Sequence, residues 1–132
     1  MKTDEQLLEE LKRAVEGLLF MSEADYPFEV VRLNNRTELN QQLFELSGAA
    51  AGDGVETLGV EEFFRAVASE SEWKQGEELA TARRYQALVR LLKENLTALS
   101  VYKVGKINMH VFIVGKSAQG SWLGLRTRVV ET

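Results

Sequence analysis

The chain has 132 residues, 45% of them hydrophobic, and a formal net charge of -4 at pH 7. This length and apolar content fit one compact domain over residues 1–132. The chain contains no cysteine, which excludes a disulfide framework and a thiolate metal site. The acidic balance argues against a general nucleic-acid binder and permits a basic partner. No basic leader or long apolar run occurs, so we expect a cytoplasmic protein.

The first predicted element is a helix, because apolar residues recur every three or four positions over residues 7–18. Thr3 and Gln6 fit a capping box at its start. Gly17 either ends this helix or occupies its last turn, and the sequence leaves both interpretations open. We expect the apolar run 18–21 to close the helix into the core.

A short acidic loop, residues 22–25, separates this apolar run from the first predicted strand at 28–33. Buried residues on both sides are expected to hold the loop. Pro27 stiffens it further, because proline fixes its own φ and favours an extended conformation at Tyr26. A carboxylate on a braced loop loses little conformational entropy when it binds a partner. Glu23 is therefore the principal candidate for a binding residue.

The middle of the chain is predicted to be mixed. A second helix is expected from the N-cap candidate Thr37 through a leucine repeat to Gly48. The glycine-rich stretch 48–54 lacks the lysine and hydroxyl pair of a P-loop, so we interpret it as a plain loop. A short strand at 55–58 and an amphipathic helix beginning at Val60 follow.

A charged loop, residues 69–76, carries Trp73 next to Glu72. Because the neighbours of Trp73 are charged, its ring either folds back over the core or stands out as an interface anchor, and both alternatives stay open. The longest helix is expected over residues 77–96, with a basic outer face that we interpret as solvated.

The last part of the chain has the two-residue period of strands, which we predict at 101–104, 107–114 and 122–130. Residues 115–120 are expected to form a hairpin loop. Gly105 either turns the chain between two strands or kinks one long strand. Helices dominate the first three quarters and strands the end, so we predict an α+β domain with helices packed on a mainly antiparallel, twisted sheet.

No catalytic constellation is evident. His110 is the only histidine, it alternates with apolar residues, and it has no second histidine or cysteine to form a metal or nucleophilic site. We interpret it as a satisfied structural residue. The adjacent glutamate pairs on the predicted helices are typical of solvent-facing or helix-start charges. The residues alone indicate an α+β interaction domain with one braced acidic loop, and we expect no cofactor.

Two separated motifs carry a family resemblance. Residues 17–30 read GLLFMSEADYPFEV, and the later strands contribute residues 101–105, 111–115 and 127–132. Together they resemble the nuclease A inhibitor family over essentially the whole chain. The resemblance implies an α/β/α sandwich. It also implies a protein inhibitor of a sugar-nonspecific DNA/RNA endonuclease with a magnesium-containing active site, and not an enzyme.

The resemblance further implies roles for four residues. Glu23 matches a glutamate that reaches the catalytic metal of the partner, so the chain holds no metal of its own. Glu72 and Trp73 match an acidic-aromatic pair at the interface, where the family pattern has aspartate before the tryptophan. Thr132 matches a C-terminal threonine that approaches basic groups used for substrate phosphate. Carboxylates suit these positions because divalent cations and arginines that bind phosphate oxygens also bind carboxylate oxygens.

Two other function classes remain. A regulatory binding module would keep the fold and the acidic loop but recognise a different, non-nuclease partner. A small hydrolase would use the loop carboxylates with a bound metal, but no histidine or second positioned carboxylate accompanies Glu23. For the inhibitor, direct binding to nucleic acid or to a membrane is not expected.

Overall fold

A computed structural model of the chain describes residues 3–21, 25–33, 55–68, 76–105 and 108–130. Within these ranges the helices are α1 (Asp4–Val15), α3 (Val60–Ala68) and α4 (Glu77–Asn95). The strands are β1 (Leu19–Met21), β2 (Asp25–Pro27), β3 (Glu29–Arg32), β4 (Val55–Leu58), β5 (Thr97–Val104), β6 (Asn108–Lys116) and β7 (Trp122–Val130). The α+β prediction is confirmed.

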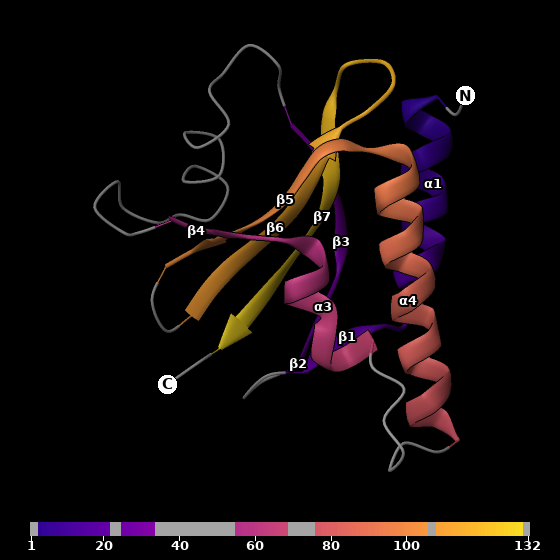
Figure 1. The fold of residues 1–132 in the computed structure, drawn as a ribbon, viewed down its shortest axis with the longest axis vertical. Helices are drawn as coiled ribbons and strands as arrows, with labels where there is room; N and C mark the ends of the chain where they lie inside the picture. Colours follow the sequence, from indigo (N-terminus) through magenta and orange to yellow (C-terminus); the bar gives the residue numbers. More distant parts are fainter. Residues whose placement is uncertain (1–2, 22–24, 34–54, 69–75, 106–107, 131–132) are drawn as a thin grey trace.

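The strands form two separate sheets. The main sheet is five-stranded in the order β3-β7-β6-β5-β4, and β1 pairs only with β2. Every pairing among the described strands is antiparallel, as predicted. The main sheet is open, with β3 at one edge and β4 at the other (Figure 1).

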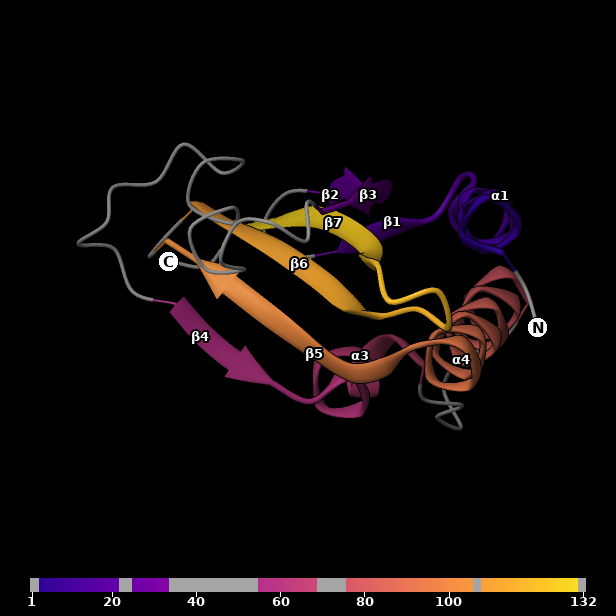
Figure 2. The same ribbon diagram turned by 90° about the horizontal axis from the view of Figure 1, so that it is seen from above.

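The three described helices cover one face of the main sheet (Figure 2). Alternate residues of each strand point to this face, as the period of two requires. The resulting core removes large apolar side chains from water, which is the main favourable contribution to folding. Its buried members include Leu7 and Leu11 of α1, Phe64 of α3, Tyr85, Leu88 and Leu92 of α4, and Val101, Val111, Ile113, Leu123 and Leu125 of the sheet.

The opposite face of the sheet carries a second, smaller apolar cluster. It comprises Leu33, Val104, Phe112 and Val114, with Val31, Val55, Tyr102 and Trp122 packed against them. An α/β/α sandwich requires a helix layer on this side too. The helix predicted from Thr37 to Gly48 lies outside the described residues, which form two layers, so the third layer stays a prediction.

Helix α1 begins as predicted. The Thr3 hydroxyl accepts a hydrogen bond from the Gln6 backbone N–H (3.2 Å), and the Gln6 side chain accepts one from the Thr3 N–H (2.9 Å). This capping box satisfies two amide donors that a helix start otherwise leaves unpaired.

The end of α1 corrects one prediction and decides an open question. The helix stops at Val15, and Gly17 adopts φ +75°, a left-handed conformation that favours glycine, so Gly17 ends the helix. Leu18 is buried, as expected. The next three residues do not extend the helix into the core, however: they form β1, and Leu19 is 46% exposed.

The other predicted elements that fall within the described residues agree with the structure to within a few residues. The predicted helix 77–96 is α4, with Tyr85, Leu88 and Leu92 on its buried face. Strand β5 starts at Thr97, earlier than predicted, directly after α4. Gly105, with φ +113°, follows the end of β5 and therefore turns the chain instead of kinking a strand. None of the described helices is long and apolar enough to cross a membrane.

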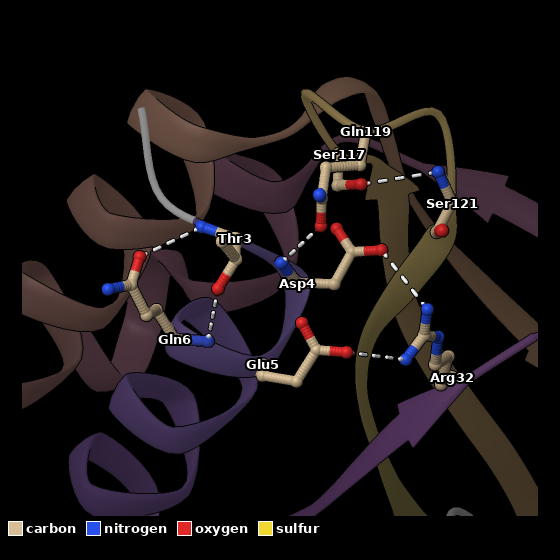
Figure 3. Close-up of polar contacts among 8 residues, drawn as sticks. All are labelled: Thr3, Asp4, Glu5, Gln6, Arg32, Ser117, Gln119 and Ser121. Atoms are coloured by element: carbon tan, nitrogen blue, oxygen red, sulfur yellow. Dashed lines mark hydrogen bonds and ion pairs between the residues drawn. The ribbon is translucent and has the colours of Figure 1, made fainter.

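A polar cluster fixes the start of α1 against the sheet (Figure 3). The buried Asp4 carboxylate accepts a hydrogen bond from Arg32 of β3 (3.3 Å), and the Asp4 backbone N–H donates to the Gln119 side chain (2.7 Å). Burial raises the pKa of Asp4, but the neighbouring Ser117 and Ser121 side chains and the charge of Arg32 outweigh it, so the pKa is lowered overall. The start of α1 is thus tied to β3 and to the β6–β7 loop.

Candidate functional site

The predicted acidic loop joins the two strands of a hairpin. Strands β1 and β2 pair in the register Leu19↔Pro27, Phe20↔Tyr26 and Met21↔Asp25. Glu23 belongs to the three-residue connection 22–24 between these strands, and this connection lies outside the described residues. The expectation of buried residues on both sides of the loop holds for Leu18 and Phe28, but Leu19 is 46% exposed, and the segment before the loop is a strand and not a helix end.

The first strand of the hairpin is attached to α4 by a side chain. The Tyr85 hydroxyl donates a hydrogen bond to the Leu19 carbonyl oxygen (2.6 Å). Tyr85 is only 1% exposed, and burial raises its pKa to about 12 against the opposing effect of Arg84. The phenol therefore keeps its proton, and remains a donor, throughout the neutral pH range.

The second strand of the hairpin is attached to β7. The Thr127 hydroxyl donates to the Pro27 carbonyl oxygen (2.9 Å), and Thr127 is 4% exposed. The guanidinium of Arg128 lies over the Tyr26 ring, 5.1 Å from its centroid, in a cation-π contact. Contacts with the main body of the protein therefore hold both strands of the hairpin.

Arg84 holds the chain that leads into β1. Its Nη2 donates to the carbonyl oxygens of Ala14 (3.1 Å) and Glu16 (2.7 Å), at the end of α1, where carbonyl groups lack helical partners and the helix dipole favours a cation. The interpretation of the basic face of α4 as merely solvated is therefore wrong for Arg84. It is also wrong for Lys93, which pairs with Glu61 of α3.

All four predicted site residues lie outside the described residues: Glu23, Glu72, Trp73 and Thr132. The described segments that flank them can be located. The β1–β2 hairpin, the end of α3 and the end of β7 lie in the lower half of Figure 1. The start of α1 and the β6–β7 loop lie at the opposite, upper end.

The two alternatives for Trp73, a core lid or an interface anchor, concern a residue outside the described part of the chain. Sequence reasoning did not identify Arg84, Tyr85 or Thr127 as residues that hold the acidic hairpin. Tyr85 and Thr127 each carry a hydroxyl group at a position that the apolar pattern marks as buried. A buried hydroxyl needs a hydrogen-bond partner, so these two residues could have been singled out from the sequence.

His110 lies in β6 on the face opposite the helices, directly across from Arg128 of β7. Its Nδ1 is buried and has no hydrogen-bond partner among the described residues, which differs from the expectation of a satisfied histidine. Burial lowers the pKa of His110, and the nearby charges of Arg128 and Arg126 lower it further. Within the described ranges no group of three His, Cys, Asp or Glu residues is placed to hold a metal ion.

The lowered pKa of His110 predicts a stability change near neutral pH. The unfolded chain takes up the histidine proton near the ordinary pKa of 6.5, whereas the folded protein does so only at lower pH. The stability that the neutral imidazole provides is thus present above pH 6.5 and is lost as pH falls through the folded pKa. Urea unfolding at a series of pH values should show this decline, and His110→Gln should make it shallower. Equal slopes for the two proteins would contradict the assignment.

A comparison with protein families gives a match that spans the hairpin and the elements that hold it. The family model described as "NuiA: Nuclease A inhibitor-like protein" matches residues 5–132, nearly the whole chain. The comparison with curated proteins gave no match.

Proposed function

The chain belongs to the nuclease A inhibitor-like family, and from this premise we propose that it inhibits a magnesium-dependent, sugar-nonspecific DNA/RNA endonuclease by blocking the active site. The observation that carries the proposal is the family match over residues 5–132, which includes the acidic hairpin and the elements that hold it. The proposal assigns no catalysis to the chain itself.

In the proposed mechanism Glu23 is the central contact. Its carboxylate would take the place of a phosphodiester oxygen at the catalytic magnesium of the nuclease, because magnesium prefers hard oxygen ligands. The attached hairpin supports this role, since a carboxylate presented on an ordered support loses less conformational entropy on binding. Glu72 and Trp73 would add a second contact, with the indole ring as an anchor.

Titration of a magnesium-dependent, sugar-nonspecific endonuclease that digests supercoiled plasmid tests the proposal. We expect protection that is complete at about one inhibitor per nuclease, as tight active-site binding requires. No protection at a large excess would favour the alternative, a regulatory module with a different, non-nuclease partner. Cleavage of a phosphoester by the protein alone would favour the hydrolase.

The proposal also gives a role to the carboxylate of Thr132, directed at basic residues that otherwise bind phosphate. Extending the chain beyond Thr132 by a few small neutral residues should therefore weaken inhibition by about tenfold, the effect of losing one charge-assisted contact. The inhibition constant of the extended protein measures this effect, and circular dichroism checks its fold.

The same extension before Met1 is the matched control. Helix α1 starts at the end of the molecule opposite the hairpin (Figure 1), so an extension there should leave inhibition unchanged. If the two extended proteins inhibit as tightly as the original chain, Thr132 has no role as a terminal carboxylate.

A further inference from the structure

We propose that Tyr85 and Thr127 are positioning residues for inhibition, because they hold the two strands of the β1–β2 hairpin, between which Glu23 lies in the sequence. This inference rests on the proposed function and deepens it. Two buried hydroxyl groups, one on α4 and one on β7, hold the strands on either side of the acidic connection.

The hairpin needs such support because it is small and separate. Each of its strands has three residues, and neither pairs with a strand of the main sheet. An isolated two-stranded hairpin is marginally stable in water even when it is longer than this one. Contacts with the rest of the protein must therefore decide how firmly it is held.

The two hydroxyl groups bind the same cross-strand residue pair of the hairpin. Leu19 and Pro27 are directly opposite each other in the register. Tyr85 donates to the carbonyl oxygen of Leu19, and Thr127 donates to that of Pro27. Leu19 and Pro27 form the residue pair farthest from the connection 22–24. Each is held by a different element of the main body, Leu19 by α4 and Pro27 by β7.

Both donors are themselves fixed. The Tyr85 ring packs against the rings of Phe28, at 6.1 Å between centroids, and Phe64, at 5.8 Å. Thr127 is buried in β7 and lies opposite Val111 of the neighbouring strand β6. Donors on buried, packed side chains can hold the hairpin at one position, which is what a preorganised contact requires.

The role predicts a loss of affinity that acts through Glu23. Removal of the Tyr85 hydroxyl leaves the aromatic packing in place but frees the Leu19 carbonyl. The hairpin then has to be ordered on binding, and the loss of one such hydrogen bond corresponds to about tenfold in affinity. If the hydroxyl stabilised only the global fold, inhibition by the folded protein would not change.

The first test compares matched variants by their inhibition constant for the magnesium-dependent endonuclease on plasmid and by hydrogen exchange of the backbone amides of residues 19–26. Tyr85→Phe should weaken inhibition by about tenfold and accelerate exchange in the hairpin. Tyr102→Phe, which removes a hydroxyl from the other face of the sheet, should change neither. Thr127→Val should behave like Tyr85→Phe, whereas Thr127→Ser keeps the hydroxyl and should retain inhibition.

A double-mutant cycle separates positioning from plain stabilisation. Tyr85→Phe should cost about tenfold in the original chain and almost nothing in a Glu23→Gln background, since its effect depends on the carboxylate. Equal losses in both backgrounds, or no loss in the original chain, would overturn the inference.

If the unmodified protein does not inhibit, the proposed function fails, and unchanged hairpin exchange in Tyr85→Phe would separately refute the attachment. If Tyr85→Phe does not fold, the Thr127→Val and Thr127→Ser pair decides.

Discussion

Replacement of Glu23 by Gln should weaken inhibition by at least about thirtyfold, or about 2 kcal/mol, the largest effect we expect from any single side chain of the interface. Glutamine has nearly the shape of glutamate, so the change removes the charge that we propose to face the metal and alters the volume of the side chain very little. The loss should appear in the inhibition constant measured with the magnesium-dependent nuclease and plasmid substrate.

Glu94→Gln is the matched control for this change. It removes the same charge from an exposed position near the end of α4, away from the hairpin (Figure 1), and it should leave inhibition nearly unchanged. A loss of similar size in both variants would mean that net charge alone drives binding. Unchanged inhibition by folded Glu23→Gln protein would remove the metal-directed role of Glu23.

The largest effect on stability is expected at Gly124 of β7. A Cβ atom at this position would lie 2.0 Å from the carbonyl oxygen of Ile113 and 2.9 Å from the Cα of Val114. Both atoms belong to the backbone of β6, in the interior of the main sheet, and neither can move aside without breaking the strand pairing. Gly124→Ala should therefore lower the free energy of unfolding by about 3 kcal/mol or more.

Gly59 provides the control, because a Cβ there would meet nothing within 4 Å. Gly59→Ala should leave stability within about 0.5 kcal/mol of the original protein. Urea denaturation followed by tryptophan fluorescence measures both variants. An unchanged midpoint for Gly124→Ala would show that β6 and β7 pair less closely than the structure indicates.

The elements with strong local patterns could be predicted from the sequence. Thr3 and Gln6 define the start of α1 through a capping box that lies within four residues. The buried positions of α4 repeat at helical spacing over several turns. In both cases the signal comes from residues close together in the sequence, and tertiary contacts did not change the predicted element.

The hairpin was harder to predict, for a physical reason. Four consecutive apolar residues, 18–21, suit the buried end of a helix as well as a short strand. The choice depends on the left-handed conformation of Gly17 and on pairing with residues 25–27, which a periodicity argument does not include. A three-residue strand also has too few positions to establish a period.

The supports of the hairpin are non-local. Tyr85 is 66 residues from Leu19, and Thr127 is 100 residues from Pro27. Helical spacing alone puts Tyr85 among the buried residues of α4 but does not identify the acceptor of its hydroxyl. The residues themselves indicated Glu23 as a binding candidate and Trp73 as a possible interface anchor, and the family resemblance implied Glu72, Thr132 and the role of each. All four stay predictions, since they lie outside the described residues.

The order of the strands in the main sheet determines how much of the chain must be synthesised before the β1–β2 hairpin can be held in place. Strand β3 is synthesised early, but its partner β7 is made after every other strand of the sheet. Pairing between such distant segments is slow compared with the local hairpins β5–β6 and β6–β7, so folding should start in those hairpins. Thr127, which holds β2, also belongs to β7. A nascent chain therefore cannot present a fixed acidic hairpin until synthesis has passed β7, and partly made chains should leave the nuclease active.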